Sequence, residues 1–218
     1  MDDLMLRQAV LDELEFDPSI EAAHIGVAAN KGVVTLTGRV SSFAEKIAAE
    51  RAAMRVRGVK AVAQEILVRY PEDKKTADDE IAARALKLIA WHASIPPDAI
   101  KVKVQDGVVT LSGAVPWHYQ RSEVEAAVRR LGGVVAVINT VGLRPTHAVR
   151  ASEIETRIRE ALKRNAECEG NAIHVSVPND HTVRLEGQVQ AWSERSLAQR
   201  AAWSVPGITN VEDRIVVV

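Results

Sequence analysis

Few residues in this sequence have the spacing that catalysis or metal binding requires. No glycine-rich phosphate loop is present, and no Ser/His/Asp or Cys/His set has the spacing of a nucleophilic site. His174 and His181 would face each other across a predicted hairpin, but two imidazoles without a nearby carboxylate or thiolate make a weak metal site. Cys168 is the single cysteine, which excludes an intrachain disulfide and a cysteine-rich zinc site. We therefore predict no catalytic residue, no metal, no cofactor and no enzymatic activity.

Aromatic and cationic side chains form a second pattern, which could bind without catalysing. Each aromatic lies where a predicted strand leads into a helix, and each cation follows about one helical turn later. These candidate lipid- or partner-binding residues are Phe43, Trp117, Trp192, Lys46, Arg121 and Arg195. An aromatic beside a cation could seat the chain on a phospholipid surface. The alternative interpretation is a hydrophobic staple that covers the end of a sheet. Two further aromatics, Phe16 and Trp91, end predicted helices and are expected to close a core.

Composition restricts the classes of partner. Of 218 residues, 47% are hydrophobic and 26% charged, which is usual for a soluble globular protein. The net charge of −1 gives no overall field for attracting nucleic acid, so we predict no nucleic-acid partner. The N-terminal residues are acidic and no apolar run is long enough to cross a membrane, so we expect no signal peptide and no transmembrane segment. These features predict a cytoplasmic protein, with peripheral membrane contact left open.

One short pattern recurs three times and organises the chain. Residues 106–115 read DGVVTLSGAV, residues 31–40 read KGVVTLTGRV, and residues 180–189 read DHTVRLEGQV. Their glycines, Gly38, Gly113 and Gly187, are spaced by 75 and then 74 residues. Self-similarity at a fixed spacing indicates repeated structural units. We therefore predict three units, at residues 1–70, 77–143 and 151–218.

Hydrophobic periodicity predicts the same elements in each unit. An apolar stripe at helical spacing, such as Leu6, Val10 and Leu14, predicts a first helix, and alternating residues then predict a two-stranded hairpin. A second, alanine-rich helix is expected at 43–57, 119–131 and 193–205, followed by a closing strand. The fold class is α+β: three tandem αββαβ two-layer sandwiches, each a three-stranded mixed sheet with two helices on one face. The strand–helix–strand part should be a right-handed parallel crossover. The mid-strand glycine is expected where a helix crosses close to the sheet.

The hairpin motif, the alanine-rich helix and the closing G-V-x-x-V strand resemble the BON domain. The resemblance covers the whole chain as three tandem copies, and in the third copy His181 stands where the hairpin glycine is expected. It implies an αββαβ sandwich and a non-enzymatic role, with contact to phospholipid or envelope components. Relatives in this family are linked to osmotic stress, and one type is linked to potassium.

The outward-facing strand positions differ between the units. In the third unit they are strongly polar, with residues such as Arg184, Glu186, Glu212 and Arg214. In the first unit they are Gly26, Ala28, Val33, Thr35, Ala61 and Ala63, and in the second Lys101, Lys103, Val108, Thr110, Ala136 and Ile138. A two-layer sandwich leaves one sheet face bare, and polar residues are what make such a face stable in water. We therefore expect units 1 and 2 to dock on each other, on a partner, or on another copy through these faces.

Together these features favour a non-catalytic binding or scaffold protein of tandem BON-like modules, linked to osmotic or envelope stress. The alternatives are a peripheral binder of anionic phospholipid and a potassium-binding sensor that holds the ion with backbone carbonyls. Carbonyl sites leave no side-chain pattern, so the sequence is silent about potassium.

Overall fold

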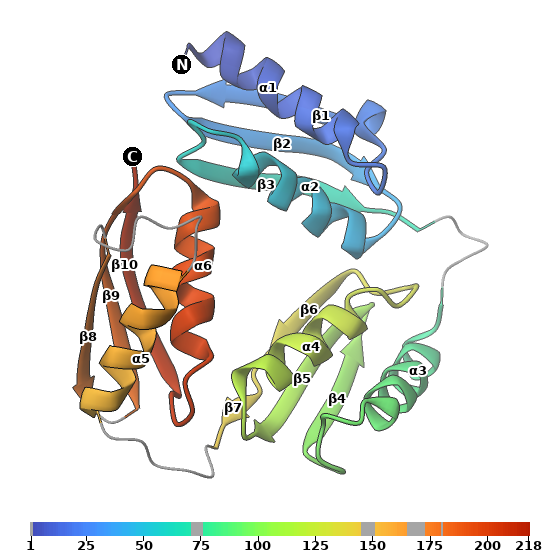
Figure 1. Cartoon of the computed structure of the whole chain (residues 1–218). Helices are drawn as coiled ribbons and strands as arrows, with labels where there is room; N and C mark the ends of the chain where they lie inside the picture. The colour runs from blue at the N-terminus through green and yellow to red at the C-terminus, as the bar shows by residue number, and fades with distance from the viewer. Residues whose placement is uncertain (1, 71–75, 145–150, 165–172, 180) are drawn as a thin grey trace. The chain divides into compact units, whose positions relative to one another are not determined.

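The computed structural model describes residues 2–70, 76–144, 151–164, 173–179 and 181–218 (Figure 1). We call its three repeated parts repeats 1, 2 and 3. Repeat 1 contains α1 (Asp3–Phe16), the short 3-10 helix η1 (Ala22–His24), β1 (Ile25–Asn30), β2 (Val33–Val40), α2 (Phe43–Arg55) and β3 (Ala61–Val68). Repeat 2 contains α3 (Asp78–Trp91), β4 (Ile100–Gln105), β5 (Val108–Val115), α4 (His118–Val128), β6 (Ala136–Asn139) and β7 (Gly142–Leu143). Repeat 3 contains α5 (Ala151–Arg164), β8 (Ile173–Asn179), β9 (Thr182–Val189), α6 (Trp192–Trp203) and β10 (Asn210–Val217).

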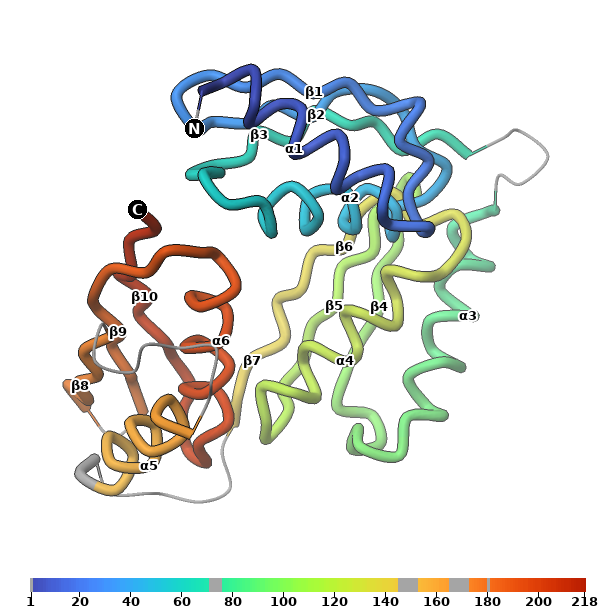
Figure 2. Tube along the Cα trace, turned by 45° about the horizontal axis from the view of Figure 1, so that its top comes forward, coloured from blue at the N-terminus to red at the C-terminus, as the bar shows by residue number. Residues whose placement is uncertain are grey.

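Each repeat builds its own small mixed sheet, as predicted. In repeat 1 the strand order is β1-β2-β3, with β1 antiparallel and β3 parallel to β2. Repeat 3 has the same arrangement in the order β10-β9-β8. In repeat 2 the third strand is divided into β6 and β7, and both pieces pair with β5. The course of the chain through each sheet can be followed in Figure 2. The predicted α+β fold of tandem αββαβ modules is therefore confirmed.

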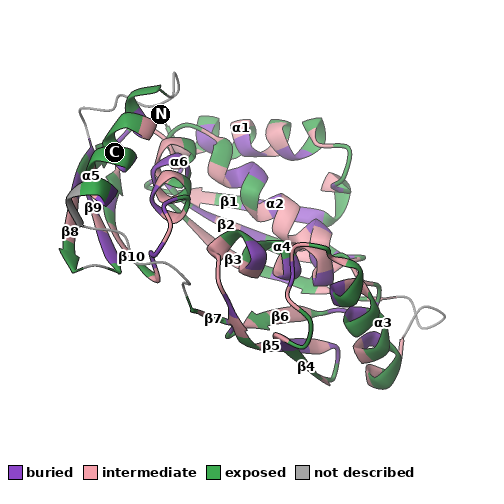
Figure 3. Cartoon of the chain, turned by 60° about the horizontal axis from the view of Figure 1, so that its bottom comes forward, coloured by how far each residue is buried: buried purple, intermediate pink, exposed green. Residues whose placement is uncertain are grey.

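The helices lie on one face of each sheet, and aliphatic side chains fill the space between. In repeat 1 the predicted stripe of Leu6, Val10 and Leu14 is buried together with Leu36 and Ile66, which are fully enclosed. Figure 3 colours the elements by burial, with their buried parts in purple. Repeat 3 has an equivalent core around Ile154, Ile158 and Leu185. Since each of these two clusters draws its members from a single repeat, repeats 1 and 3 each enclose their own apolar interior.

The mid-strand glycines are required for a different reason from the one predicted. Gly38 and Gly113 have φ angles of +123° and +124°, a conformation that side chains with a Cβ rarely adopt. A Cβ on Gly38 would lie 2.1 Å from the carbonyl oxygen of His24, and one on Gly113 would lie 2.1 Å from that of Ala99. The obstacle is thus the backbone leading into the neighbouring strand, not a crossing helix. The prediction of a close helix was wrong.

Phe16 and Trp91 do not close a core, which corrects a second expectation. Their exposed fractions are 82% and 88%. Phe16 follows Leu14 by two residues, and two residues turn an α-helix by about 200°, so Phe16 leaves the buried stripe. Ile20, which is buried, lies just beyond the end of the helix and covers the core instead.

The second helices are shorter than predicted. They end at Arg55, Val128 and Trp203 instead of at residues 57, 131 and 205. The backbone N–H of Val56 donates to the carbonyl of Ala53, a bond that closes a tighter turn and ends the helix.

Candidate functional site

The three candidate cations hold the second helix of each repeat on the third strand. The Nζ atom of Lys46 donates to the backbone carbonyl of Ile66 at 2.7 Å. In repeat 2, the Nη2 atom of Arg121 donates to a backbone carbonyl of β6 at 3.4 Å. In repeat 3, the Nε atom of Arg195 lies 2.6 Å from a carboxylate oxygen of Asp213. These contacts give each cation a structural role within its own repeat, where it joins the second helix to the third strand.

A polar side chain on the third strand completes this arrangement in each repeat. Oxygens of Gln64, Asn139 and Asp213 accept hydrogen bonds from the backbone N–H two residues later, at 3.2, 3.1 and 2.9 Å. The third strand is an edge of its sheet, so these N–H groups would otherwise be available to another strand. Sequence reasoning missed these residues. The available signal was a residue with a side-chain oxygen acceptor at the same position of the third strand in all three repeats.

The candidate aromatics differ in their surroundings. Phe43 is buried, with the guanidinium carbon of Arg129 at 5.9 Å from its ring centroid. Trp117 is partly buried, and its ring centroid lies 6.4 Å from that of Tyr119. Trp192 is also partly buried, with Arg195 over its ring at 4.9 Å. Trp117 and Trp192 therefore contact residues of their own helix starts, whereas Phe43 contacts a residue of repeat 2, and none of the three is an openly exposed side chain.

Glu45 is a buried carboxylate that sequence reasoning did not identify. It is 8% exposed, and its oxygens accept hydrogen bonds from the backbone N–H groups of Glu21 and Ser41, each at 3.0 Å. The hydroxyl of the N-cap Ser42 accepts from the N–H of Glu45, as in a capping box, but the Glu45 carboxylate accepts from the N–H of Ser41 instead of from that of Ser42. The S-x-x-E pattern in the sequence could have revealed it. Its carboxylate is fully engaged in positioning the helix.

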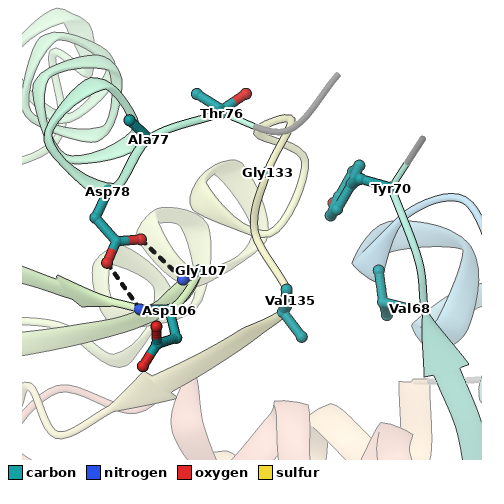
Figure 4. A pocket seen from close by; sticks show the side chains of 9 residues that line it. All are labelled: Val68, Tyr70, Thr76, Ala77, Asp78, Asp106, Gly107, Gly133 and Val135. Carbon is teal, nitrogen blue, oxygen red and sulfur yellow. Dashed lines mark hydrogen bonds between the residues drawn. The ribbon is translucent and has the colours of Figure 1, made fainter. Parts of the chain in front are cut away.

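A cavity of about 850 Å³ is lined by Tyr70, Asp78 and Asp106, among others (Figure 4). The carboxylate of Asp78 accepts hydrogen bonds from the N–H groups of Asp106 and Gly107, at 2.7 and 2.9 Å, and thereby ties α3 to the hairpin turn. Tyr70 donates its hydroxyl proton to the carbonyl of Val134 at 2.8 Å, and burial raises the pKa of Tyr70. Both polar groups already have backbone partners, so the cavity presents no acid–base pair poised for proton transfer.

The predicted histidine pair does not converge on one point. His174 lies in register with Glu186 on the exposed face of repeat 3, whereas the Nδ1 atom of His181 contacts the carbonyl oxygen of Gly207 at 2.9 Å. Among the described residues, no group of three His, Cys, Asp or Glu side chains could hold a metal ion. Cys168 lies outside the described residues.

The sheet faces opposite the helices remain open, and they differ as predicted. In repeat 3 this face carries salt bridges between Arg184 and Glu212 at 2.8 Å and between Arg214 and Glu186 at 3.3 Å. The hydrogen bond from Arg184 lowers the pKa of Glu212 below its ordinary value. The exposed Val216 of repeat 3 shares its face with these salt bridges. In the described parts of repeats 1 and 2, the faces expose apolar residues without such pairs beside them: Val33, 43% exposed, lies beside Ala61, and Ile138, 51% exposed, lies beside Thr110. These apolar faces are the strongest candidate binding surfaces of the chain.

Comparison with known proteins finds two relatives at about one-third identity. The chain is 32% identical over 143 residues to "Osmotically-inducible protein Y" of Escherichia coli (strain K12), covering 64% of this chain and 71% of that protein. It is also 32% identical over 123 residues to an uncharacterized protein in the gshII 5' region of Anaplasma centrale, covering 55% of this chain and 82% of that one.

A likeness to a solved structure is much weaker. CdsD, a structural protein of the type III secretion system of Chlamydia trachomatis, matches 100% of this chain and 93% of that one, at a TM-score of 0.28 and 16% identity. Values this low carry no argument about fold or function. None of the helices in the described part of the chain has the length and apolar character needed to cross a membrane.

The family model for the BON domain matches residues 2–70, 77–145 and 150–218. These three matches coincide with the three sheets and their helices, and they confirm the resemblance seen in the hairpin motifs. The chain therefore belongs to the BON domain family, of which it carries three tandem copies.

Proposed function

We propose that this chain is a non-catalytic binding or scaffold protein of the osmotic-stress response, and that it binds through the open sheet faces of repeats 1 and 2. The observation that supports this most is a contrast in charge: the open face of repeat 3 carries two ion pairs around the exposed Val216, whereas the exposed Val33 and Ile138 of repeats 1 and 2 lie beside Ala61 and Thr110. Exposed apolar residues on a sheet cost free energy unless a partner covers them. The likeness to an osmotically inducible protein supports the stress response as the setting.

Growth after a shift to high osmolarity tests this role. A strain that lacks the protein should recover more slowly than one that carries it, and the wild-type gene should restore recovery. A chain with Thr35→Arg and Ile138→Arg should fold but fail to restore it, because each charge lies on an open face. The matched control is Arg184→Lys on the polar face of repeat 3, which should restore growth. Equal recovery of the deletion and parent strains would contradict the proposal.

Peripheral binding to anionic phospholipid is a second candidate, supported by the exposure of Phe16 and Trp91. These aromatics occupy equivalent positions at the ends of α1 and α3, and their exposed fractions are 82% and 88%. Lys87, which is also exposed, precedes Trp91 by one helical turn. An exposed aromatic beside a cation suits the headgroup region of a bilayer. These helix ends support lipid contact better than Trp117 and Trp192, which are partly buried.

Flotation with vesicles containing anionic lipid separates the two sets of aromatics. If lipid binds at the helix ends, Trp91→Ala should reduce retention several-fold, while Trp117→Ala should leave it unchanged. The opposite pattern would restore the originally predicted residues as the lipid site. No retention of the wild-type chain at low salt would remove the lipid candidate altogether.

A further inference from the structure

We propose that the open sheet face of repeat 1 packs against the same face of a second copy of this chain. This inference rests on the proposed function, because it names the occupant of one of the faces described there. The face is formed by the outward residues of β1, β2 and β3, the three strands shown in Figure 1. The first halves of β2 and β3 carry Val33, Thr35, Ala61 and Ala63 on this face, and the second halves carry Arg39, Glu65 and the exposed Leu67.

The free edges of the sheet are partly closed, which favours association through the face. The edge N–H and carbonyl of Ile66 are bonded by the side chains of Gln64 and Lys46. On the opposite edge, the Nε atom of Arg7 donates to the carbonyl of Val27 at 2.9 Å. A partner that added a strand at either edge would have to break such bonds first.

The arrangement of side chains on the face is complementary to itself. Val33 lies beside Ala61 and Thr35 beside Ala63 on neighbouring strands. A two-fold axis along the strands, between β2 and β3, would place each branched residue of one copy opposite an alanine of the other. Self-complementarity of this kind is what a two-fold symmetric interface requires. Two sheets with such small side chains can approach to about 10 Å, the usual spacing of packed sheets.

The charges on the face fit the same axis. Arg39 pairs in register with Leu67, and Glu65 pairs with Thr37, so the two charged residues lie diagonally on adjacent strands. Both are exposed, and neither forms a salt bridge within the described part of the chain. The same axis brings Arg39 of each copy diagonally opposite Glu65 of the other, so two intermolecular ion pairs form. A patch with one charge of each sign is thus neutral as a whole and matches only a partner with the reversed arrangement, which a second copy supplies.

Repeat 3 shows which residues make the same sheet face stable when it is exposed to solvent. At the positions of Thr35 and Ala63 it carries Arg184 and Glu212, which pair with each other. A face of three short strands is at the small end of stable interfaces, so we expect a weak dimer whose formation depends on protein concentration.

Sedimentation equilibrium of the full chain, from about 1 to about 500 µM, measures this association. The wild-type chain should pass from monomer to dimer, and Ala63→Arg should remain monomeric, because Ala63 lies on β3 beside the axis and its charge would be buried. Ser176→Arg, on the outward face of repeat 3, is the control and should dimerise like wild type. Circular dichroism melting should show that both variants fold, since both positions lie on outward faces.

A charge exchange tests the symmetric pairing directly. Arg39→Glu alone and Glu65→Arg alone should each weaken the dimer at least tenfold, because like charges would meet twice. When the two single variants are mixed, they should form a heterodimer, since both carboxylates of the first variant then meet guanidinium groups of the second. The double variant should also dimerise on its own.

Two outcomes would overturn the proposal. One is a wild-type chain that stays monomeric throughout, as it would if repeats 1 and 2 covered each other within one chain. The other is a mixture of the two charge variants that forms no heterodimer. Either result leaves the osmotic-growth test of the proposed function intact.

Discussion

At the scale of single residues, the position of a side chain in the fold determines its role more than its residue type does. Lys46, Arg121 and Arg195 were candidates for binding because each follows an aromatic, yet each of them contacts the third strand of its own repeat. The residues that complete these contacts, Gln64, Asn139 and Asp213, lie 18 positions later in the chain. No local pattern relates a helix start to a strand so far along the sequence, which is why sequence reasoning missed the connection.

Asp213 provides the sharpest test of this arrangement. Its side chain is 10% exposed and pairs with Arg195, and it also accepts from the backbone N–H of Ile215. Asp213→Ala should lower the free energy of unfolding of repeat 3 by about 1–3 kcal/mol, because a mostly buried guanidinium and an edge N–H both lose their partner. Amide hydrogen exchange at Ile215 should accelerate in this variant. Asp213→Asn keeps an acceptor for the N–H, so it should protect Ile215 while still weakening the contact to Arg195. Equal exchange in the alanine and asparagine variants would contradict the assignment.

The charged face of repeat 3 gives a prediction about pH. The hydrogen bond from Arg184 lowers the pKa of Glu212 below 4.5. A lowered pKa in the folded state means that the interaction stabilises the fold at neutral pH and is lost as the pH falls through the lowered pKa. The NMR titration midpoint of the Glu212 carboxyl should therefore lie below 4.5 and rise in the Arg184→Gln variant. A midpoint that does not move in that variant would show that the ion pair does not form.

At the scale of elements, the hairpin and its glycine were both predictable, but the reason for the glycine was not. The alternation of apolar residues places Gly113 in a strand, and only the structure shows its φ of +124° and its approach to the carbonyl of Ala99. The ends of the helices likewise show that an element can be predicted while the environment of one of its residues cannot. The stripe of Leu6, Val10 and Leu14 defines the buried side of α1, and Phe16 lies off that stripe. The expectation that Phe16 is buried rested on its hydrophobicity. Its angular position on the helix is what determines its exposure.

Gly113→Ala tests the backbone constraint within one element. The added methyl group must adopt an unfavourable φ and would meet the oxygen of Ala99 at 2.1 Å, so we expect a loss of stability above about 2 kcal/mol. Gly132→Ala is the matched control, because a Cβ at that position meets nothing within 4 Å. Urea unfolding followed by circular dichroism compares the two variants. A similar midpoint for both would mean that the strand shifts easily to make room.

At the scale of the whole molecule, the three repeats share a fold but not a surface. The cores of repeats 1 and 3 are aliphatic and local, whereas the outward faces range from the ion pairs of Arg184 and Glu212 to the nearly neutral face around Val33. Cores are constrained by packing, and an outward face is free to vary with what it contacts. Differences in function between the repeats therefore belong to these faces.

Independent cores predict independent unfolding. Leu111 is fully buried in repeat 2, and Leu111→Ala should destabilise that repeat by about 2–5 kcal/mol through the cavity it leaves. Hydrogen exchange followed by mass spectrometry should then show faster exchange across residues 76–144 and little change in residues 173–218. Leu185→Ala in repeat 3 should give the reverse pattern. Faster exchange throughout the chain in either variant would indicate that the repeats unfold as one unit.

The amino-acid sequence by itself determined the number of repeats, their order of helices and strands, and the family. These properties follow from apolar periodicity and glycine spacing, which act over a few residues and leave a direct record in the chain. Only the tertiary structure decided which side chains meet across a helix and a strand, which aromatics are exposed, and which charges pair on the open faces. Such properties depend on residues distant in sequence: Lys46 reaches Ile66, and Thr35 lies beside Ala63, only once the sheet and its helices have assembled.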